Sequence, residues 1–126
     1  MKSGGLTPGP LARLELPCLD PHRQRDFFGR ILGLPPIGAG PTLHFAMGGV
    51  ELVLRARGDA YFPTGPSDAG ALLAFPVPDA DLDRWHRRML TARVAVLDAP
   101  GPAGAPPRLL RIADPEGNVV ELFAVP

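Results

Sequence analysis

Two spacings of apolar residues recur along the chain, one of two residues and one of three to four. The first is typical of a strand with one buried face, the second of a helix with one buried stripe. Strands are predicted at residues 11–18, 42–47, 50–55, 71–77, 93–97, 108–113 and 119–123. A short or irregular segment fills residues 35–41, and helices are predicted to begin after the capping residues Asp20 and Asp79.

Each predicted helix has an apolar stripe that should face a sheet. The stripe residues are Phe27, Phe28, Ile31 and Leu32 in the first helix and Leu82, Trp85, Met89 and Leu90 in the second. Pro21 suits the first helical position, and Gly33 can end the first helix.

The last two strands read as a hairpin. Asp114 can bond the turn backbone, Pro115 presets φ, and Gly117 closes a type I turn at its fourth position. Glu121 lies in the middle of the apolar strand at 119–123. A buried carboxylate needs a cation, a metal or water, so Glu121 is either a cleft residue with such a partner or a glutamate on a half-exposed rim.

An earlier hairpin turns at Gly48-Gly49, which suits a two-residue primed turn. The resulting register pairs Ala46 with Glu51 and places His44 on the same face as Glu51. His44 is then either a general base near neutral pH or a hydrogen-bonded packing residue.

The two halves of the chain match in the order of their elements. Residues 16–20 and 75–79 share a proline and a capping aspartate at the same spacing, and residues 49–52 and 117–122 share a glycine turn and a glutamate-bearing strand. Each half therefore reads β-α-β-β-β. We expect the two glutamates to occupy equivalent places and to face each other across a shared cleft.

This repeat suggests a domain division. Residues 1–10 are predicted to be a flexible tail, and residues 11–126 a single domain of two modules. The modules span residues 11–58 and 70–126, joined by a connector at 59–69.

Composition narrows the class of protein. The chain has 126 residues with 13 basic and 13 acidic side chains, so no global field favours nucleic acid or a membrane as partner. A single cysteine excludes an intramolecular disulfide. No export pattern or long apolar run is present, and we expect a cytoplasmic protein.

Three features together resemble the vicinal oxygen chelate superfamily, which includes glyoxalase I, bleomycin-resistance proteins, fosfomycin-resistance enzymes and extradiol dioxygenases. They are Asp20 with Phe27-Phe28 and Leu32-Gly33-Leu34, the two βαβββ halves, and Asp114-Pro115-Glu116-Gly117-Asn118-Val119-Val120-Glu121-Leu122. The resemblance implies an α+β fold in which two βαβββ modules pair into a curved mixed sheet around a cleft, with one helix per module on the outside.

Metal-using members of that superfamily take ligands from four positions. The resemblance places the two final-strand ligands on Glu51 and Glu121, and the two first-strand positions on Arg13 and Leu72. Leucine cannot bind a metal, and arginine would repel one. We therefore expect no metal cofactor; the alternative is a weakly bound divalent ion at Glu51 and Glu121, with His44 as a further ligand.

Several polar residues are candidates for lining the cleft. They are Arg13, Glu15, His44, Glu51, Arg111 and Glu121. Arg13 either grips an anionic ligand or forms an internal salt bridge with one of the glutamates, and Glu15 is either a further cleft acid or exposed. Arg111 faces Glu121 only if the register of the closing hairpin holds.

The leading hypothesis from sequence is a metal-independent small-molecule-binding protein, acting as a homodimer with no nucleic-acid or membrane partner. The alternative is a divergent lyase, isomerase or dioxygenase-like enzyme. A third hypothesis is an interaction module whose cleft charges have lost their role. The sequence leaves open whether one chain or two would form the cleft.

Overall fold

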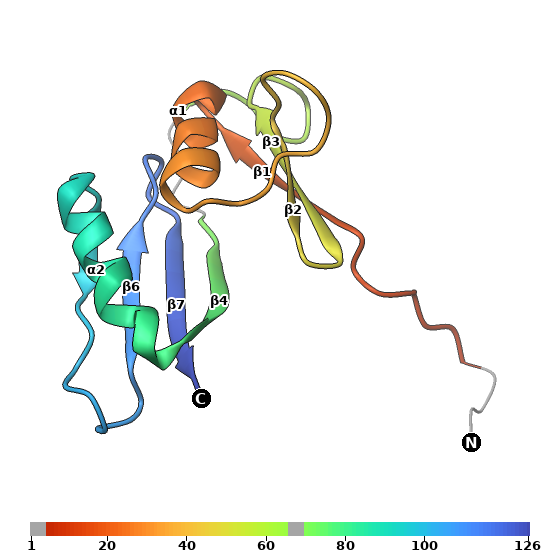
Figure 1. The fold of residues 1–126 in the computed structure, drawn as a ribbon. Helices are drawn as coiled ribbons and strands as arrows, with labels where there is room; N and C mark the ends of the chain where they lie inside the picture. Colours follow the sequence, from red (N-terminus) through yellow and green to blue (C-terminus); the bar gives the residue numbers. More distant parts are fainter. Residues whose placement is uncertain (1–4, 66–69) are drawn as a thin grey trace.

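The computed structural model describes residues 5–65 and 70–126, and it shows two modules in succession (Figure 1). The first contains β1 (Arg13–Cys18), α1 (Pro21–Arg25), the π-helical turn η1 (Asp26–Ile31), β2 (His44–Met47) and β3 (Val50–Ala56). The second contains β4 (Leu72–Pro78), the 3-10 turn η2 (Asp79–Asp81), α2 (Leu82–Thr91), β5 (Ala95–Asp98), β6 (Leu109–Ala113) and β7 (Val119–Val125). Parts of the predicted tail and connector, residues 1–4 and 66–69, lie outside the described residues.

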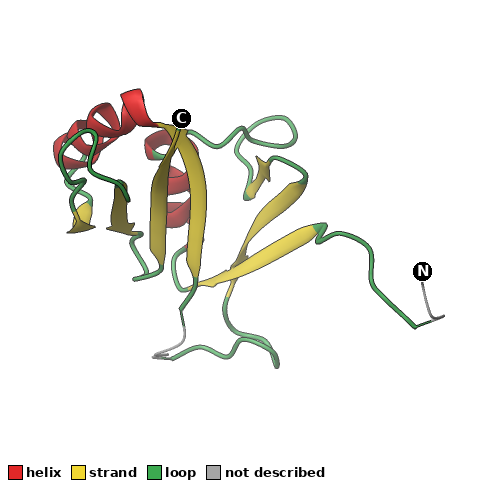
Figure 2. Cartoon of the chain, turned by 90° about the horizontal axis from the view of Figure 1, so that it is seen from below, coloured by secondary structure: helices red, strands yellow, loops and turns green. Residues whose placement is uncertain are grey.

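Each module builds its own sheet. The strand order is β1-β3-β2 in the first and β4-β7-β6-β5 in the second, with the first and last strands of each module parallel. The α+β class with two βαβββ-type modules is thus confirmed, but the modules of one chain form two separate sheets, set at an angle in Figure 2. The segment at 35–41 contributes one bridge, between Pro36 and Phe45, because its prolines lack the N–H that a ladder needs.

One apolar core joins the modules, formed by the inner faces of both sheets and the two helices. It includes Leu16, Phe27, Phe28, Phe45, Leu52, Leu54, Leu82, Met89, Leu110, Ile112, Val120 and Leu122. The prediction for Leu90 was wrong, because its side chain is 56% exposed. Leu90 follows the fully buried Met89 by one position, and a rotation of 100° turns it away from the sheet.

The first helix continues past Arg25 as a π-helical turn. The amide of Leu32 donates to the carbonyl of Phe27 at 2.8 Å, five residues back. This wider winding lets the consecutive residues Phe27 and Phe28 both turn toward the core, where their rings meet edge to face with centroids 5.0 Å apart.

The closing hairpin has the predicted turn. The Gly117 amide donates to the Asp114 carbonyl at 3.0 Å, and Gly117 has a φ of +89°. The Asp114 carboxylate oxygen Oδ1 accepts from the amides of Glu116 and Asn118 at 2.9 and 2.8 Å. Asp114 is 4% exposed, so its side chain is a buried organiser of the turn.

The same turn also ties the two modules together. Asp114 Oδ2 accepts from Gln24 Nε2 of α1 at 2.8 Å. The Glu116 carboxylate accepts from the backbone amides of Leu19 and Asp20, at 2.8 and 2.6 Å, just before α1. Figure 1 shows α1 at this junction, next to the tip of the β6–β7 hairpin. We call these contacts of Asp114 and Glu116 with residues 19–24 the module clamp.

Candidate functional site

The outer face of the first sheet carries four of the predicted cleft residues. Strand pairing sets Arg13 beside Glu51 and Ala46 in one row, and Glu15 beside Val53 and His44 in the next. The predicted hairpin register is therefore confirmed. The opposite face of the same strands packs against the first helix and the core, so this outer face is the one that solvent can reach.

Arg13 does not pair with either predicted glutamate. Its Nε lies 2.9 Å from Glu15 Oε2, on the same strand two positions along. The side chains are 59% and 31% exposed, so this ion pair is well solvated. An exposed pair of this kind contributes little to stability, and Arg13 can exchange Glu15 for an anionic ligand at low cost.

His44 and Glu51 form the most compact pair on this face. His44 Nδ1 contacts Glu51 Oε2, with the side chains 49% and 33% exposed. The bond to Nδ1 orients the ring and leaves Nε2 available as a hydrogen-bonding group or proton acceptor. The sequence placed both residues on one face, but it did not show that they touch.

Sequence reasoning missed Arg55, which extends the same face. Arg55 Nη1 lies 3.2 Å from Glu15 Oε1, and Nη2 pairs with Asp59. Its guanidinium also lies over the Phe62 ring, 5.1 Å from the centroid. The Phe62 amide, together with Arg55, holds the pKa of Asp59 below its usual range. Period-two spacing from Glu51 could have identified Arg55.

The outer face of the second sheet carries the remaining two candidates. Arg111 lies directly opposite Glu121, and its Nε donates to Glu121 Oε1 at 2.9 Å. Its Nη1 also donates to Asp98 at 3.2 Å. Glu121, followed by Asp98, raises the pKa of Arg111. Glu121 therefore has the cation that its position required, and Leu72 lies on the same outer face, 55% exposed.

The two glutamates do not meet. Glu51 is held by His44 on one sheet and Glu121 by Arg111 on the other. Their register positions also differ. Pro17 pairs with Arg55, four positions after Glu51, whereas its counterpart Pro76 pairs with Phe123, two positions after Glu121. The expectation of equivalent, facing glutamates was wrong for a single chain.

The described residues do not fit a metal cofactor within one chain. No group of three or more His, Cys, Asp or Glu side chains lies close enough there to hold an ion. Glu121 pairs with Arg111, and Arg13 and Leu72, at the two predicted first-strand positions, are not metal ligands.

The fold places this chain in the class of α+β domains built from two paired modules, each with one uncovered sheet face. Residues 11–122 match the family model of the Glyoxalase/Bleomycin resistance protein/Dioxygenase superfamily. The chain belongs to that superfamily. A search of curated proteins gives no match. No helix in the described part of the chain is long and apolar enough to cross a membrane.

Solved structures agree with this fold. A glyoxalase/bleomycin resistance protein/dioxygenase from Nocardioides is 18% identical, with 96% of this chain and 86% of that one covered and a TM-score of 0.74. A lactoylglutathione lyase from Agrobacterium tumefaciens is 23% identical, with 93% and 94% covered and a TM-score of 0.66. The fosfomycin resistance protein FosX from Mesorhizobium loti is 17% identical, with 96% and 95% covered and a TM-score of 0.68. These likenesses show the fold alone.

Proposed function

We propose that this protein is a homodimeric small-molecule-binding protein that needs no metal. The ligand would lie between the outer face of the first sheet of one copy and the outer face of the second sheet of its partner. One observation carries this proposal: Glu15, Glu51 and Glu121 each contact an arginine or histidine side chain of their own sheet, and the described residues do not converge as metal donors.

Both sheet faces are exposed to solvent in a single chain, which supports a cleft made by two copies. Both faces are uncovered, with Arg13, His44 and Arg111 all at least 40% exposed. Leu72 adds exposed apolar surface on β4. A second copy would cover this surface and exclude water from a ligand held by Arg13 and His44.

The oligomer and the ligand are tested with a matched pair of variants. Leu72 and Leu90 are 55% and 56% exposed, but only Leu72 lies on a proposed cleft face. We expect a dimer in sedimentation experiments, dissociated by Leu72→Asp and unchanged by Leu90→Asp. A monomeric wild type, or equal effects of the two variants, would contradict the shared cleft.

Binding is tested by thermal shifts against a panel of aromatic and anionic small molecules. We expect stabilisation that saturates with ligand concentration and is weakened by Arg13→Gln. The exposed helix arginine Arg23 supplies the control, and Arg23→Gln should leave the shift intact. A shift of equal size in both variants would mean that the ligand binds elsewhere.

The contact between His44 and Glu51 favours a second candidate, a divergent lyase, isomerase or dioxygenase-like enzyme. These two residues supply two donors on one face, and Glu121 of a second copy would add a third. Protein purified without chelators or a histidine tag is then assayed for metal and for thermal shifts with Mg²⁺, Mn²⁺, Fe²⁺, Ni²⁺ and Zn²⁺. Near one metal per chain, lost in Glu121→Ala, would replace the binding proposal with this one.

A further inference from the structure

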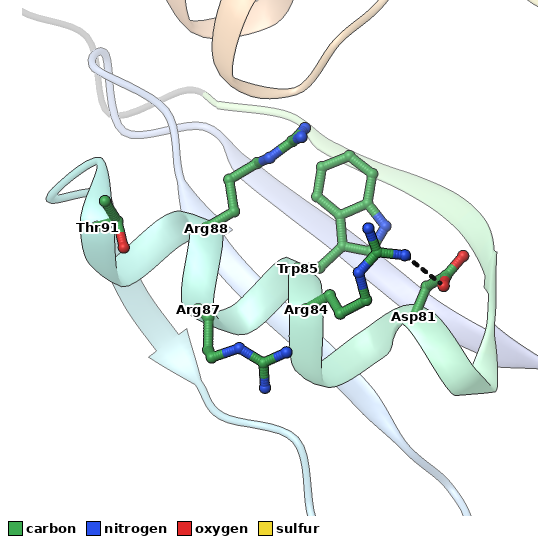
Figure 3. Close-up of a pocket in the computed structure, with 6 residues that line it drawn as sticks. All are labelled: Asp81, Arg84, Trp85, Arg87, Arg88 and Thr91. Carbon is green, nitrogen blue, oxygen red and sulfur yellow. Dashed lines mark hydrogen bonds and ion pairs between the residues drawn. The ribbon is translucent and has the colours of Figure 1, made fainter.

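A hollow of about 450 Å³ lies along the exposed side of α2, away from the two sheet faces (Figure 3). Its lining residues recur at the three- and four-residue spacing of one helix stripe. They are Asp81, Arg84, Trp85, Arg87, Arg88 and Thr91. The lining therefore combines three guanidinium groups with one carboxylate and an indole ring.

Two of these side chains stack on each other. The Arg88 guanidinium lies over the Trp85 ring at 5.0 Å from its centroid, and its Nη1 donates to the Ile31 carbonyl at the end of η1. Trp85 is itself partly buried against the core. Stacking on the indole orients the planar fork of the exposed Arg88 side chain, the contact with Ile31 is long at 3.5 Å, and most of the five donors stay free.

Trp85 contributes to two surfaces of α2. The apolar stripe of the second helix predicted only that Trp85 faces the core. In the structure Trp85 has both roles, because one part packs on the core and another lines the arginine-rich hollow.

Local carboxylates do not balance this charge. Asp79 and Asp83, at the start of the helix, bind Arg108 at 2.8 and 3.0 Å instead. Arg84 has one long contact with Asp81, at 3.4 Å. Among residues 5–65 and 70–126, no ion pair of Arg87 or Arg88 is found. Like charges three and four positions apart disfavour a helix, so an anion in the hollow would relieve an existing repulsion.

We propose that this hollow binds the phosphate group of a small phosphorylated ligand. Arg88 would hold two phosphate oxygens through its planar fork, and Arg84 would exchange its long contact with Asp81 for a third. A zero net charge on the whole chain disfavours a nucleic-acid partner, which needs a broad basic surface.

Trp85 is the only tryptophan, so its fluorescence reports directly on this hollow. The experiment titrates the full-length protein with inorganic phosphate and pyrophosphate at constant ionic strength, with chloride as the balancing anion. We expect a saturable change in emission, stronger with pyrophosphate. In Arg88→Gln the affinity should fall about tenfold or more, as expected for loss of charge-assisted bonds.

Arg23→Gln is the matched control, since Arg23 is an exposed helix arginine outside this hollow. The proposal is overturned if the response does not saturate, or if Arg23→Gln weakens it as much as Arg88→Gln. It is also overturned if single-stranded DNA gives a saturable response where phosphate and pyrophosphate give none. Far-UV circular dichroism of each variant checks that α2 is retained.

Discussion

Replacing Asp114 with alanine tests whether one carboxylate organises both the closing turn and the module clamp. Asp114 is 4% exposed and accepts four hydrogen bonds, two from turn amides and one each from Gln24 Nε2 and Asn118 Nδ2 at 2.8 and 2.9 Å. Each bond to a charged acceptor is worth roughly 1.5–3 kcal/mol, and bonds to one group are not additive. We expect a loss of about 3–5 kcal/mol in the free energy of unfolding.

That loss would be a large share of the whole free energy of unfolding, which is about 5–15 kcal/mol for a typical domain. Urea unfolding should show it as a lower midpoint with an unchanged slope. A double-mutant cycle then measures the interaction energy between Gln24 and Asp114. Gln24→Leu, alone and with Asp114→Ala, should give a coupling energy of about 1–2 kcal/mol.

Two outcomes would refute this reasoning. A loss below about 1 kcal/mol in Asp114→Ala would mean that water replaces the carboxylate, as happens at exposed turns. A coupling energy near zero would mean that the contact between Gln24 and Asp114 does not join the modules. Asp114→Asn is the control for shape. Its amide oxygen can still accept from the turn amides, but its NH2 group would face the donors Gln24 Nε2 and Asn118 Nδ2, so it should lose the clamp bond and keep the turn.

Three further predictions concern single positions. Burial raises the pKa of the Cys18 thiol from 9.0 to about 12, so it should resist thiol reagents at pH 8 until the protein is unfolded. Between pH 9 and 12 the thiol ionises in the unfolded chain but not in the folded one, so the free energy of unfolding of the wild type should fall by about 1.4 kcal/mol per pH unit more than that of Cys18→Ala. Chemical unfolding at several pH values measures this difference, which would be absent if the site were solvated. Leu122→Ala should cost about 3–5 kcal/mol by urea unfolding because Leu122 is 1% exposed, while Leu90→Ala should cost under about 0.5 kcal/mol; similar losses would contradict the core described above. Arg111→Leu should lower the melting temperature by leaving Glu121 unpaired, and adding Glu121→Leu should restore much of it; a further fall in the double variant would argue against the ion pair.

Local patterns predicted local structure well in this chain. The Gly48 turn set the register of β2 and β3, and the turn from Asp114 to Gly117 set that of β6 and β7, so Arg111 meets Glu121 as expected. Turn geometry and period-two alternation involve neighbouring residues, and a single sequence carries that information.

The arrangement of distant elements could not be predicted in the same way. The repeat suggested that Glu51 and Glu121 were equivalent, but a similar motif does not fix how each strand is offset against its parallel neighbour. The sequence also could not show that Arg13 pairs with Glu15 and not with a glutamate on a neighbouring strand. A long exposed side chain can form ion pairs with several partners that differ little in free energy.

The module clamp makes the two halves structurally different. The hairpin of the first half has a turn of two glycines, whereas in the second half Asp114 and Glu116 of the hairpin turn form hydrogen bonds with the start of the first helix. Expressing residues 11–58 without the rest would remove these contacts. The two halves keep the same plan, yet they are no longer interchangeable, because the carboxylates of the module clamp belong to the second half alone.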